Sequence, residues 1–316
     1  MLQEFLEDFR AGTLLAREYM PPAAGVRAQL LTTDHGRYVL TVFAGPDGAE
    51  MIPGLADFLA EHHIPCPRPL TARSGTRLRM LDRLPAVLSH AGSGTHPPQP
   101  DVTHCASAGA LLAQIHLAGR QLPLELPGHH RVQAWRNSAR PLQGRLGPDD
   151  GQLLAAELEF QTRYRLADLP SGLIQQGLVR ASVLATGGCI SGLAAIPDLR
   201  CGVLLQDLAA TVNDWCSRTD GALDRHLASA LLGAYHARRP LTGIERGAWP
   251  VLLRAAALHG WLSALYDAHF PLPGWDAAGA DPEAARRILL DRIRTETVAR
   301  EAWPAACTGD PGRTLS

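Results

Sequence analysis

The stretch VRAQLLTTDHGRYVLTVF, residues 26–43, decides the first part of the fold. It contains two runs rich in β-forming residues, Val26–Thr33 and Arg37–Phe43. Between them lies Asp34-His35-Gly36, whose residue types are typical of a tight turn. The stretch therefore predicts a β-hairpin at the start of a small antiparallel sheet.

The segments around the hairpin complete a first lobe. Residues 2–15 have helical spacing, and this helix is predicted to end before Pro21-Pro22. Residues 51–63 carry apolar side chains at helical spacing, and a strand is expected around residues 76–81. Helix, hairpin, helix and strand together predict a small lobe over residues 1–83.

The second lobe is predicted to start at about residue 84. It begins with a connection rich in Gly, Ser and Pro over residues 92–100, and its pattern is then mostly helical. Apolar residues recur at helical spacing from Ala108 to Ile115, and Thr103 is the expected N-terminal cap. Further helices are predicted at residues 151–167, 208–216, 223–238, 244–269 and 282–299. Residues 170–203 indicate two short strands with loops, and a loose tail is expected from Pro304. The chain is thus predicted to be α+β and bilobal, with a second lobe over residues 84–316.

Composition excludes several classes of function. The 316 residues are 46% hydrophobic and 19% charged, as in a folded globular protein, and the net charge is -1. No cluster of arginines forms a basic stripe, so nucleic acid is not an expected partner. The chain contains no lysine, which excludes a Walker-type phosphate grip and Schiff-base catalysis.

The same pattern bears on location and metals. The N-terminus lacks the features of a signal peptide and no apolar run is long enough to span a membrane, so a cytoplasmic protein is expected. The cysteines form no CxxC pair and are predicted to be free thiols in a reducing compartment: Cys66, Cys105, Cys189, Cys201, Cys216 and Cys307. The adjacent pairs His62-His63 and His129-His130 lack metal-ligand spacing and indicate solvated loops.

Several stretches resemble one family of enzymes. They are THCASAGALLAQIHLAG (103–119), DLAATVNDWC (207–216), AWPVLLRAAAL (248–258), WLSALYD (261–267) and, in the first lobe, GRYVLTVF (36–43). These resemble homoserine kinases related to choline kinases and aminoglycoside phosphotransferases, over roughly residues 1–298 and without gaps over residues 169–217. The resemblance implies a protein-kinase-like fold with a nucleotide-side N-lobe and a helical C-lobe. It also implies ATP:homoserine phosphotransfer in threonine biosynthesis.

The segment LPSGLIQQGLVRASVL, residues 169–184, departs from the family's catalytic pattern. That pattern reads approximately His-Gly/Ala-Asp-Leu-Phe-Arg-Asp-Asn-Val-Leu, followed after a hairpin by Ile-Asp-Phe. There an aspartate accepts the proton of the attacking hydroxyl, while an asparagine and a second aspartate hold magnesium. In register, the four positions hold Gln175, Gly177, Ser182 and Ala195. Gly177 and Ala195 can neither accept a proton nor ligate a cation.

Other positions also differ. The family turn Gly-Ile-Glu-Asn-Thr-Asn over the nucleotide is matched by AAGVRA, residues 23–28, and Thr41 stands where many kinases place a phosphate-binding lysine. The pattern Arg-Phe-Trp-Leu-Ser-Arg-Leu-Tyr-Asp has His259 and Ala264 in place of its two arginines. Asp198 is expected to point away from the metal position on the opposite face of its strand.

Three polar residues remain candidates for a substrate cleft: Asp207, Asn213 and Asp214. Asp207 is also in the right place to cap the helix predicted at residues 208–216. Asn213 and Asp214 are equally consistent with a polar helix face beside a buried Trp215.

The sequence thus favours a catalytically inactive kinase-like protein that binds a small molecule or a protein partner, with no cofactor expected. The alternative is an active homoserine kinase with a rearranged site, which would use ATP and magnesium.

Overall fold

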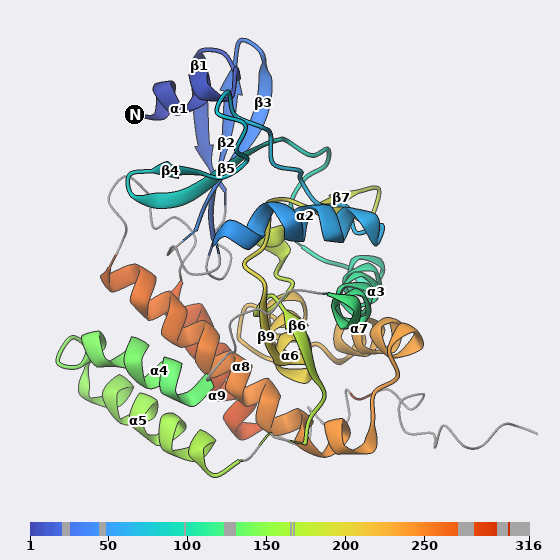
Figure 1. Ribbon diagram of the computed structural model, residues 1–316. Helices are drawn as coiled ribbons and strands as arrows, with labels where there is room; N and C mark the ends of the chain where they lie inside the picture. Colours follow the sequence, from blue (N-terminus) through green and yellow to red (C-terminus); the bar gives the residue numbers. More distant parts are fainter. Residues whose placement is uncertain are drawn as a thin grey trace, which may run out of the picture.

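The structure is a computed structural model that describes residues 1–20, 26–43, 49–97, 99–122, 131–164, 166, 168–270, 281–295 and 303. The described chain forms a small lobe built on a β-sheet and a larger, mainly helical lobe (Figure 1). The predicted α+β, bilobal architecture is confirmed. The expected tail from Pro304 and the pair His129-His130 lie outside the described residues.

The N-lobe is a five-stranded antiparallel sheet in the order β1-β2-β3-β5-β4. Its strands are β1 (Leu14–Tyr19), β2 (Val26–Thr33), β3 (Gly36–Phe43), β4 (Arg79–Leu81) and β5 (Leu84–His90). The predicted hairpin is β2–β3, with Thr33 paired to Gly36. The predicted domain boundary at residue 83 falls between the paired strands β4 and β5, so the sheet continues to His90.

The first helix is shorter than predicted. Helix α1 spans Leu2–Asp8, and the last two residues of the predicted helix, Leu14 and Leu15, are the first two residues of β1. The chain turns between them through Arg10 and Gly12, which have positive φ angles of 56° and 87°. The helical spacing of apolar residues over 2–15 therefore extends across two elements, α1 and the start of the edge strand β1.

The two faces of the sheet pack differently. Leu40 and Leu88 face α1, where they cluster with Phe5 and Leu6. On the other face, Val87 packs with residues of α2 (Ile52–Glu61), near its predicted position, and with Ile196 of the C-lobe. The second face therefore joins the lobes through apolar contacts.

Seven α-helices are described in the C-lobe. They are α3 (Val102–Ala118), α4 (Arg131–Ala139), α5 (Pro148–Thr162), α6 (Leu204–Trp215), α7 (Arg225–Arg238), α8 (Gly243–His269) and α9 (Pro282–Arg294). Helix α4 was not predicted, because its sequence is mostly polar. Within the part of the chain that the structure describes, no helix is both long and apolar enough to cross a membrane.

The N-terminus of α3 differs from the prediction. Asp101, not Thr103, is the N-cap, and its carboxylate accepts a hydrogen bond from the backbone N–H of His104 at 2.8 Å. The His104 side chain reaches back toward the Asp101 backbone N–H, which completes a capping box. Thr103 lies inside the first turn, so its hydroxyl is past the position from which a cap acts.

The segment over residues 170–203 has four short strands, where two were expected. Strands β7 (Val183–Thr186) and β8 (Cys189–Leu193) form a hairpin. Strand β6 (Ser171–Ile174) pairs with β9 (Arg200–Val203), which leads directly into α6. The loop over residues 175–182 joins the two pairs.

The described cysteines are free, as predicted: Cys66, Cys105, Cys189, Cys201 and Cys216. Cys307 lies outside the described residues, and the reducing compartment stays a prediction.

The cap of α7 gives a first testable prediction. Asp224 accepts hydrogen bonds from the backbone N–H groups of His226 and Leu227, and it forms an ion pair with Arg218. Partial burial opposes ionisation, but these contacts outweigh it and lower the pKa of Asp224. Asp224→Ala should reduce the free energy of unfolding by about 1 kcal/mol at pH 7.

A lowered pKa means that this stabilisation is present above the unfolded pKa of an aspartate and is lost as pH falls through the folded one. Urea unfolding of the wild type and Asp224→Asn should therefore show a gap that narrows below about pH 4. A gap that stays constant down to pH 2.5 would contradict this assignment.

Candidate functional site

The loop over residues 175–182 is held by one face of α6. The carboxylate of Asp207 accepts hydrogen bonds from the backbone N–H of Gln175, at 3.1 Å, and from that of Gly177. Asp207 lies in the first turn of α6, whose N-cap is Val203, so the predicted capping role of Asp207 is wrong. The prediction failed because β9 runs straight into the helix, which begins at Leu204, four residues earlier than expected.

Further along α6 the same face continues to hold the loop. The hydroxyl of Thr211 accepts from the Leu178 N–H at 2.9 Å, and the indole of Trp215 donates to the Leu178 carbonyl at 2.5 Å. Asp214 accepts from the Arg180 backbone N–H at 2.6 Å and from its guanidinium at 3.3 Å. Side chains about one helical turn apart thus fix the path of the loop backbone.

Asp207 also belongs to a chain of hydrogen bonds with two other buried side chains: His116 contacts Asp207, and Tyr235 contacts His116. His116 of α3 donates from Nε2 to Asp207 Oδ2 at 3.0 Å, because a carboxylate oxygen can only accept. Burial raises the pKa of Tyr235, so its hydroxyl keeps its proton and can donate to His116 Nδ1 at 2.7 Å. Asp207, His116 and Tyr235 are all fully or almost fully buried. This chain of hydrogen bonds connects α7, α3 and α6 to the loop.

Gly177, at the family's base position, has a backbone conformation that suits only glycine. Its φ angle is 113°, a region that residues with a side chain rarely adopt. A Cβ built there would lie 2.8 Å from the Cβ of Ala210 on α6. The preceding residue, Gln176, also has a positive φ angle, 60°. The backbone at position 177 therefore has a conformation and surroundings that leave no room for a side chain.

The residues at the family's metal positions do not fit magnesium. The Ser182 hydroxyl donates to the Val179 carbonyl at 2.7 Å, and Ala195 has no oxygen donor in its side chain. Asp198 Oδ2 accepts from Arg200 Nε at 3.1 Å and Nη2 at 2.9 Å. Burial raises the pKa of Asp198, although Arg200 opposes the shift. In the described ranges, no three His, Cys, Asp or Glu side chains gather as metal ligands do.

Two other family positions are buried. The Gln175 side chain is almost fully buried, and its amide Nε2 has no hydrogen-bond partner among the described residues. Thr41 on β3 is fully buried, and its hydroxyl likewise lacks a partner within the described part of the chain.

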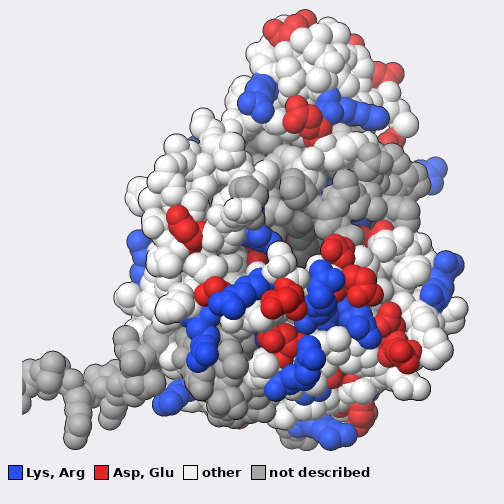
Figure 2. Space-filling model, turned by 180° about the vertical axis from the view of Figure 1, so that it is seen from behind, with Lys and Arg blue, Asp and Glu red and all other residues white. Residues whose placement is uncertain are grey.

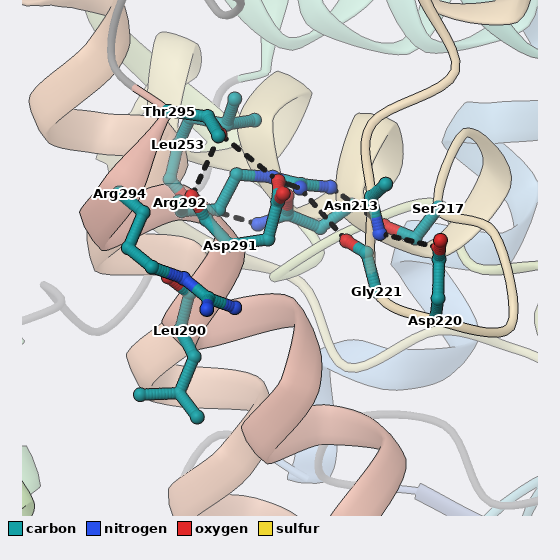
Figure 3. A network of polar contacts seen from close by, with 11 residues as sticks. Asn213, Ser217, Asp220, Gly221, Leu253, Leu290, Asp291, Arg292, Arg294 and Thr295 are labelled. Carbon is teal, nitrogen blue, oxygen red and sulfur yellow. Dashed lines mark hydrogen bonds and ion pairs between the residues drawn. The ribbon is translucent and has the colours of Figure 1, made fainter.

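Asn213 belongs to a buried polar network that fastens α9 to α6 (Figure 3). Its amide donates to the Leu253 carbonyl at 2.8 Å and accepts from Arg292 Nε at 2.9 Å. Arg292 also donates to the Gly221 carbonyl at 3.0 Å and to Ser217 Oγ at 2.7 Å. Burial lowers the pKa of Arg292, and the adjacent Asp291 opposes the shift. The nitrogen and the oxygen of the Asn213 amide thus both already form hydrogen bonds with protein groups.

The three substrate-cleft candidates therefore differ in position. Asp207 and Asn213 are buried and bonded to protein groups, whereas Asp214 is half-buried at the loop. A substrate-binding role stays a prediction for each of them.

The two positions that lack the family's arginines also differ. His259 accepts a hydrogen bond from Trp135 Nε1 at 3.0 Å, and the two rings stack, which joins α8 to α4. Ala264, further along α8, carries no polar group.

Charge on the surface is mixed. Figure 2 shows acidic and basic side chains interleaved on the rear face of the C-lobe. Pairs such as Arg286 with Asp150, at 2.7 Å, and the partly buried Arg254 with Glu157 neutralise one another.

Comparison with known proteins agrees with this architecture. A family model described as the phosphotransferase enzyme family matches residues 21–241. A microcompartment-associated aminopropanol kinase has a similar structure, with a TM-score of 0.68 and 14% identity, covering 95% of this chain and 99% of that one. Amicoumacin kinase hAmiN, in complex with AMP-PNP, Ca²⁺ and Ami, has a TM-score of 0.65 and 12% identity, with 93% of each chain covered. Fold and family model together define a protein of the phosphotransferase enzyme class.

Sequence relatives narrow this class. A homoserine kinase of Methylobacillus flagellatus is 36% identical, covering 96% of this chain and 95% of the relative. A homoserine kinase of Pseudomonas aeruginosa strain PAO1 is 37% identical, covering 93% and 94%. The chain belongs to the homoserine kinase family, as its sequence motifs predicted.

Proposed function

We propose that this homoserine kinase family protein does not catalyse phosphotransfer and acts as a binding or regulatory protein. The observation that carries the proposal is Gly177, which stands at the base position in a conformation and a space that exclude a side chain. An aspartate at position 177 would require the loop or α6 to move, because its Cβ would lie 2.8 Å from the Cβ of Ala210. The residues at the metal positions, Ser182 and Ala195, support the same reading.

The second candidate function is the family reaction, phosphorylation of L-homoserine by ATP. The names of the relatives favour it, because identities of 36% and 37% extend over almost the whole chain. It requires that other side chains take over the roles of base and metal ligands. Asp198 is the nearest carboxylate in sequence to Ala195, and its pairing with Arg200 argues against that role.

A turnover assay separates the two. The purified protein with ATP, magnesium and L-homoserine should show no phosphotransfer above background, and the gene should not support growth of a homoserine kinase-deficient strain without threonine. Loss of a positioned base alone costs about 10²- to 10⁴-fold. Turnover in the ordinary kinase range, about 1–100 per second, would establish the family reaction instead.

A further inference from the structure

A pocket of about 370 Å³ lies where the end of α2 meets α3, α7 and the short 3₁₀ turn η2 (Gly119–Gln121). Helices α3 and α7 pack against each other below the end of α2 (Figure 1). The pocket contains no residue of the loop over residues 175–182, so it is separate from the altered catalytic segment. Junctions between lobes are common places for small-molecule sites. The lining residues are His62, Gln114, Leu117, Ala118, Gln121 and Arg238.

Hydrogen bonds hold the α2 side of the pocket in place. Gln114 Nε2 donates to the carbonyl of His62 at 3.0 Å and to that of His63 at 3.3 Å. Nδ1 of His62 donates to the Phe58 carbonyl at 2.9 Å, and the two rings pack with their centroids 4.2 Å apart. These contacts fix the wall before any ligand arrives, which lowers the ordering cost of binding.

Two adjacent arginines at the end of α7 differ in their surroundings. Arg239 is 3% exposed and pairs with Glu245 at 2.8 Å. Arg238 is exposed and lines the pocket, and the described part of the chain gives it no ion pair or hydrogen bond. A guanidinium in this situation can bind a carboxylate through two parallel hydrogen bonds.

The other lining residues define the class of ligand. Arg238 is the only arginine among them and no acidic residue lines the pocket, so the site balances one negative charge. A carboxylate carries one charge, whereas a phosphate group carries nearly two at neutral pH. Leu117 and Ala118 offer an apolar surface to the rest of the ligand. The Gln121 amide oxygen is 3.4 Å from His62 Nε2, a long contact that a ligand can replace.

We propose that this pocket binds a small monocarboxylate with an apolar body, and that Arg238 binds its carboxylate group. The inference names a ligand class for the proposed binding function, on which its biological role rests.

Hexanoate is the first probe, because it joins a carboxylate to a short apolar chain. It should bind at least about 10-fold more tightly than acetate, since each buried methylene contributes roughly fourfold in affinity. Hexanamide has the same shape without the charge, and it should bind about 10-fold or more weakly than hexanoate, because a hydrogen bond between charged groups is lost. NMR titration of each probe with the purified full-length protein measures these affinities.

Substitutions locate the site. Arg238→Gln should lower hexanoate affinity by about 10-fold or more. Arg120→Gln is the matched control, because Arg120 is also exposed and precedes Gln121 in η2 but does not line the pocket. It should leave the affinity within about twofold, since salt screens a charge outside the site. Leu117→Ala should weaken hexanoate and leave acetate unchanged.

Four results would each overturn the inference: undetectable hexanoate binding, equal binding of hexanamide, tighter binding of inorganic phosphate, or equal losses in Arg238→Gln and Arg120→Gln. If Arg238→Gln does not fold, the comparison of hexanoate with hexanamide still decides. None of these results concerns turnover, so the proposed noncatalytic function would stand. Phosphotransfer to L-homoserine would instead overturn the proposed function while leaving the hexanoate affinities as they are.

Discussion

The combined substitutions Gln175→His, Gly177→Asp, Ser182→Asn and Ala195→Asp are expected to leave phosphotransfer to L-homoserine at background. Each change supplies the residue type of the active family motif. The expected deficit against an active family member is at least about 10²- to 10⁴-fold, since a base that is present but misplaced does not accept the proton in the transition state.

The physical reason lies in the backbone of the loop. At a φ angle of 113°, an aspartate at position 177 would be strained, and its Cβ would meet Ala210 at 2.8 Å. Unfavourable φ angles cost about 1–3 kcal/mol each. Relief requires the loop to shift, which breaks the Gly177 N–H contact with Asp207. Restoring the side chain is thus expected to destabilise the loop that should position it.

Two matched variants make this test specific. Gly177→Ala measures the cost of a Cβ without a carboxylate, and the triple variant that keeps Gly177 measures the other three changes. Thermal melts should show destabilisation in both variants that alter Gly177 and much less in the triple variant. Full recovery of turnover in the quadruple variant would mean that the damage is confined to one motif and that the loop adapts easily.

The N-lobe hairpin was predictable because its information is local. Two β-rich runs and a turn fix β2 and β3 almost to the residue. Strand β1 was missed because residues 2–15 satisfy helical spacing, and only the backbone reversal near Gly12 separates the two elements. Helix α4 was missed because most of its residues are polar, whereas its buried Trp135 is held by packing against His259 from a distant part of the chain.

The site was predictable in its residue types but not in its contacts. The family register identified Gln175, Gly177, Ser182 and Ala195 as altered. The role of Asp207 could not be found in the same way, since an acid at the start of an apolar helical run indicates a cap. Its actual donors lie 30 and 32 residues upstream in the loop and 91 residues upstream in α3. One local signal existed: Asp207 and Thr211 are polar residues one turn apart within a run that is otherwise largely apolar.

The altered loop nevertheless remains anchored. Asp207, Thr211, Asp214 and Trp215 all bind its backbone, and backbone groups do not depend on which side chains the loop carries. Substitution of the loop side chains is therefore compatible with a stable fold. The same reasoning predicts that the anchor is much more sensitive to mutation than the loop.

Asp207→Ala is expected to reduce the free energy of unfolding by about 3–5 kcal/mol, because it removes the acceptor of three buried hydrogen bonds. The substitution leaves the N–H groups of Gln175 and Gly177 and the Nε2 of His116 without an acceptor in a fully buried site. Each unsatisfied buried donor costs about 1–3 kcal/mol, which is consistent with that total.

The loss should appear as a fall in melting temperature of roughly 6–20 °C, at about 2–4 °C per kcal/mol. Asp214→Ala is the matched control, since Asp214 also accepts a loop N–H from the same helix but is 28% exposed. Water can replace that acceptor, so its loss should cost no more than about 1 kcal/mol. Asp207→Asn should remain destabilising, because its amide NH₂ would face a donor where a carboxylate oxygen now accepts. Equal melting temperatures for Asp207→Ala and Asp214→Ala would show that burial does not set the strength of this anchor.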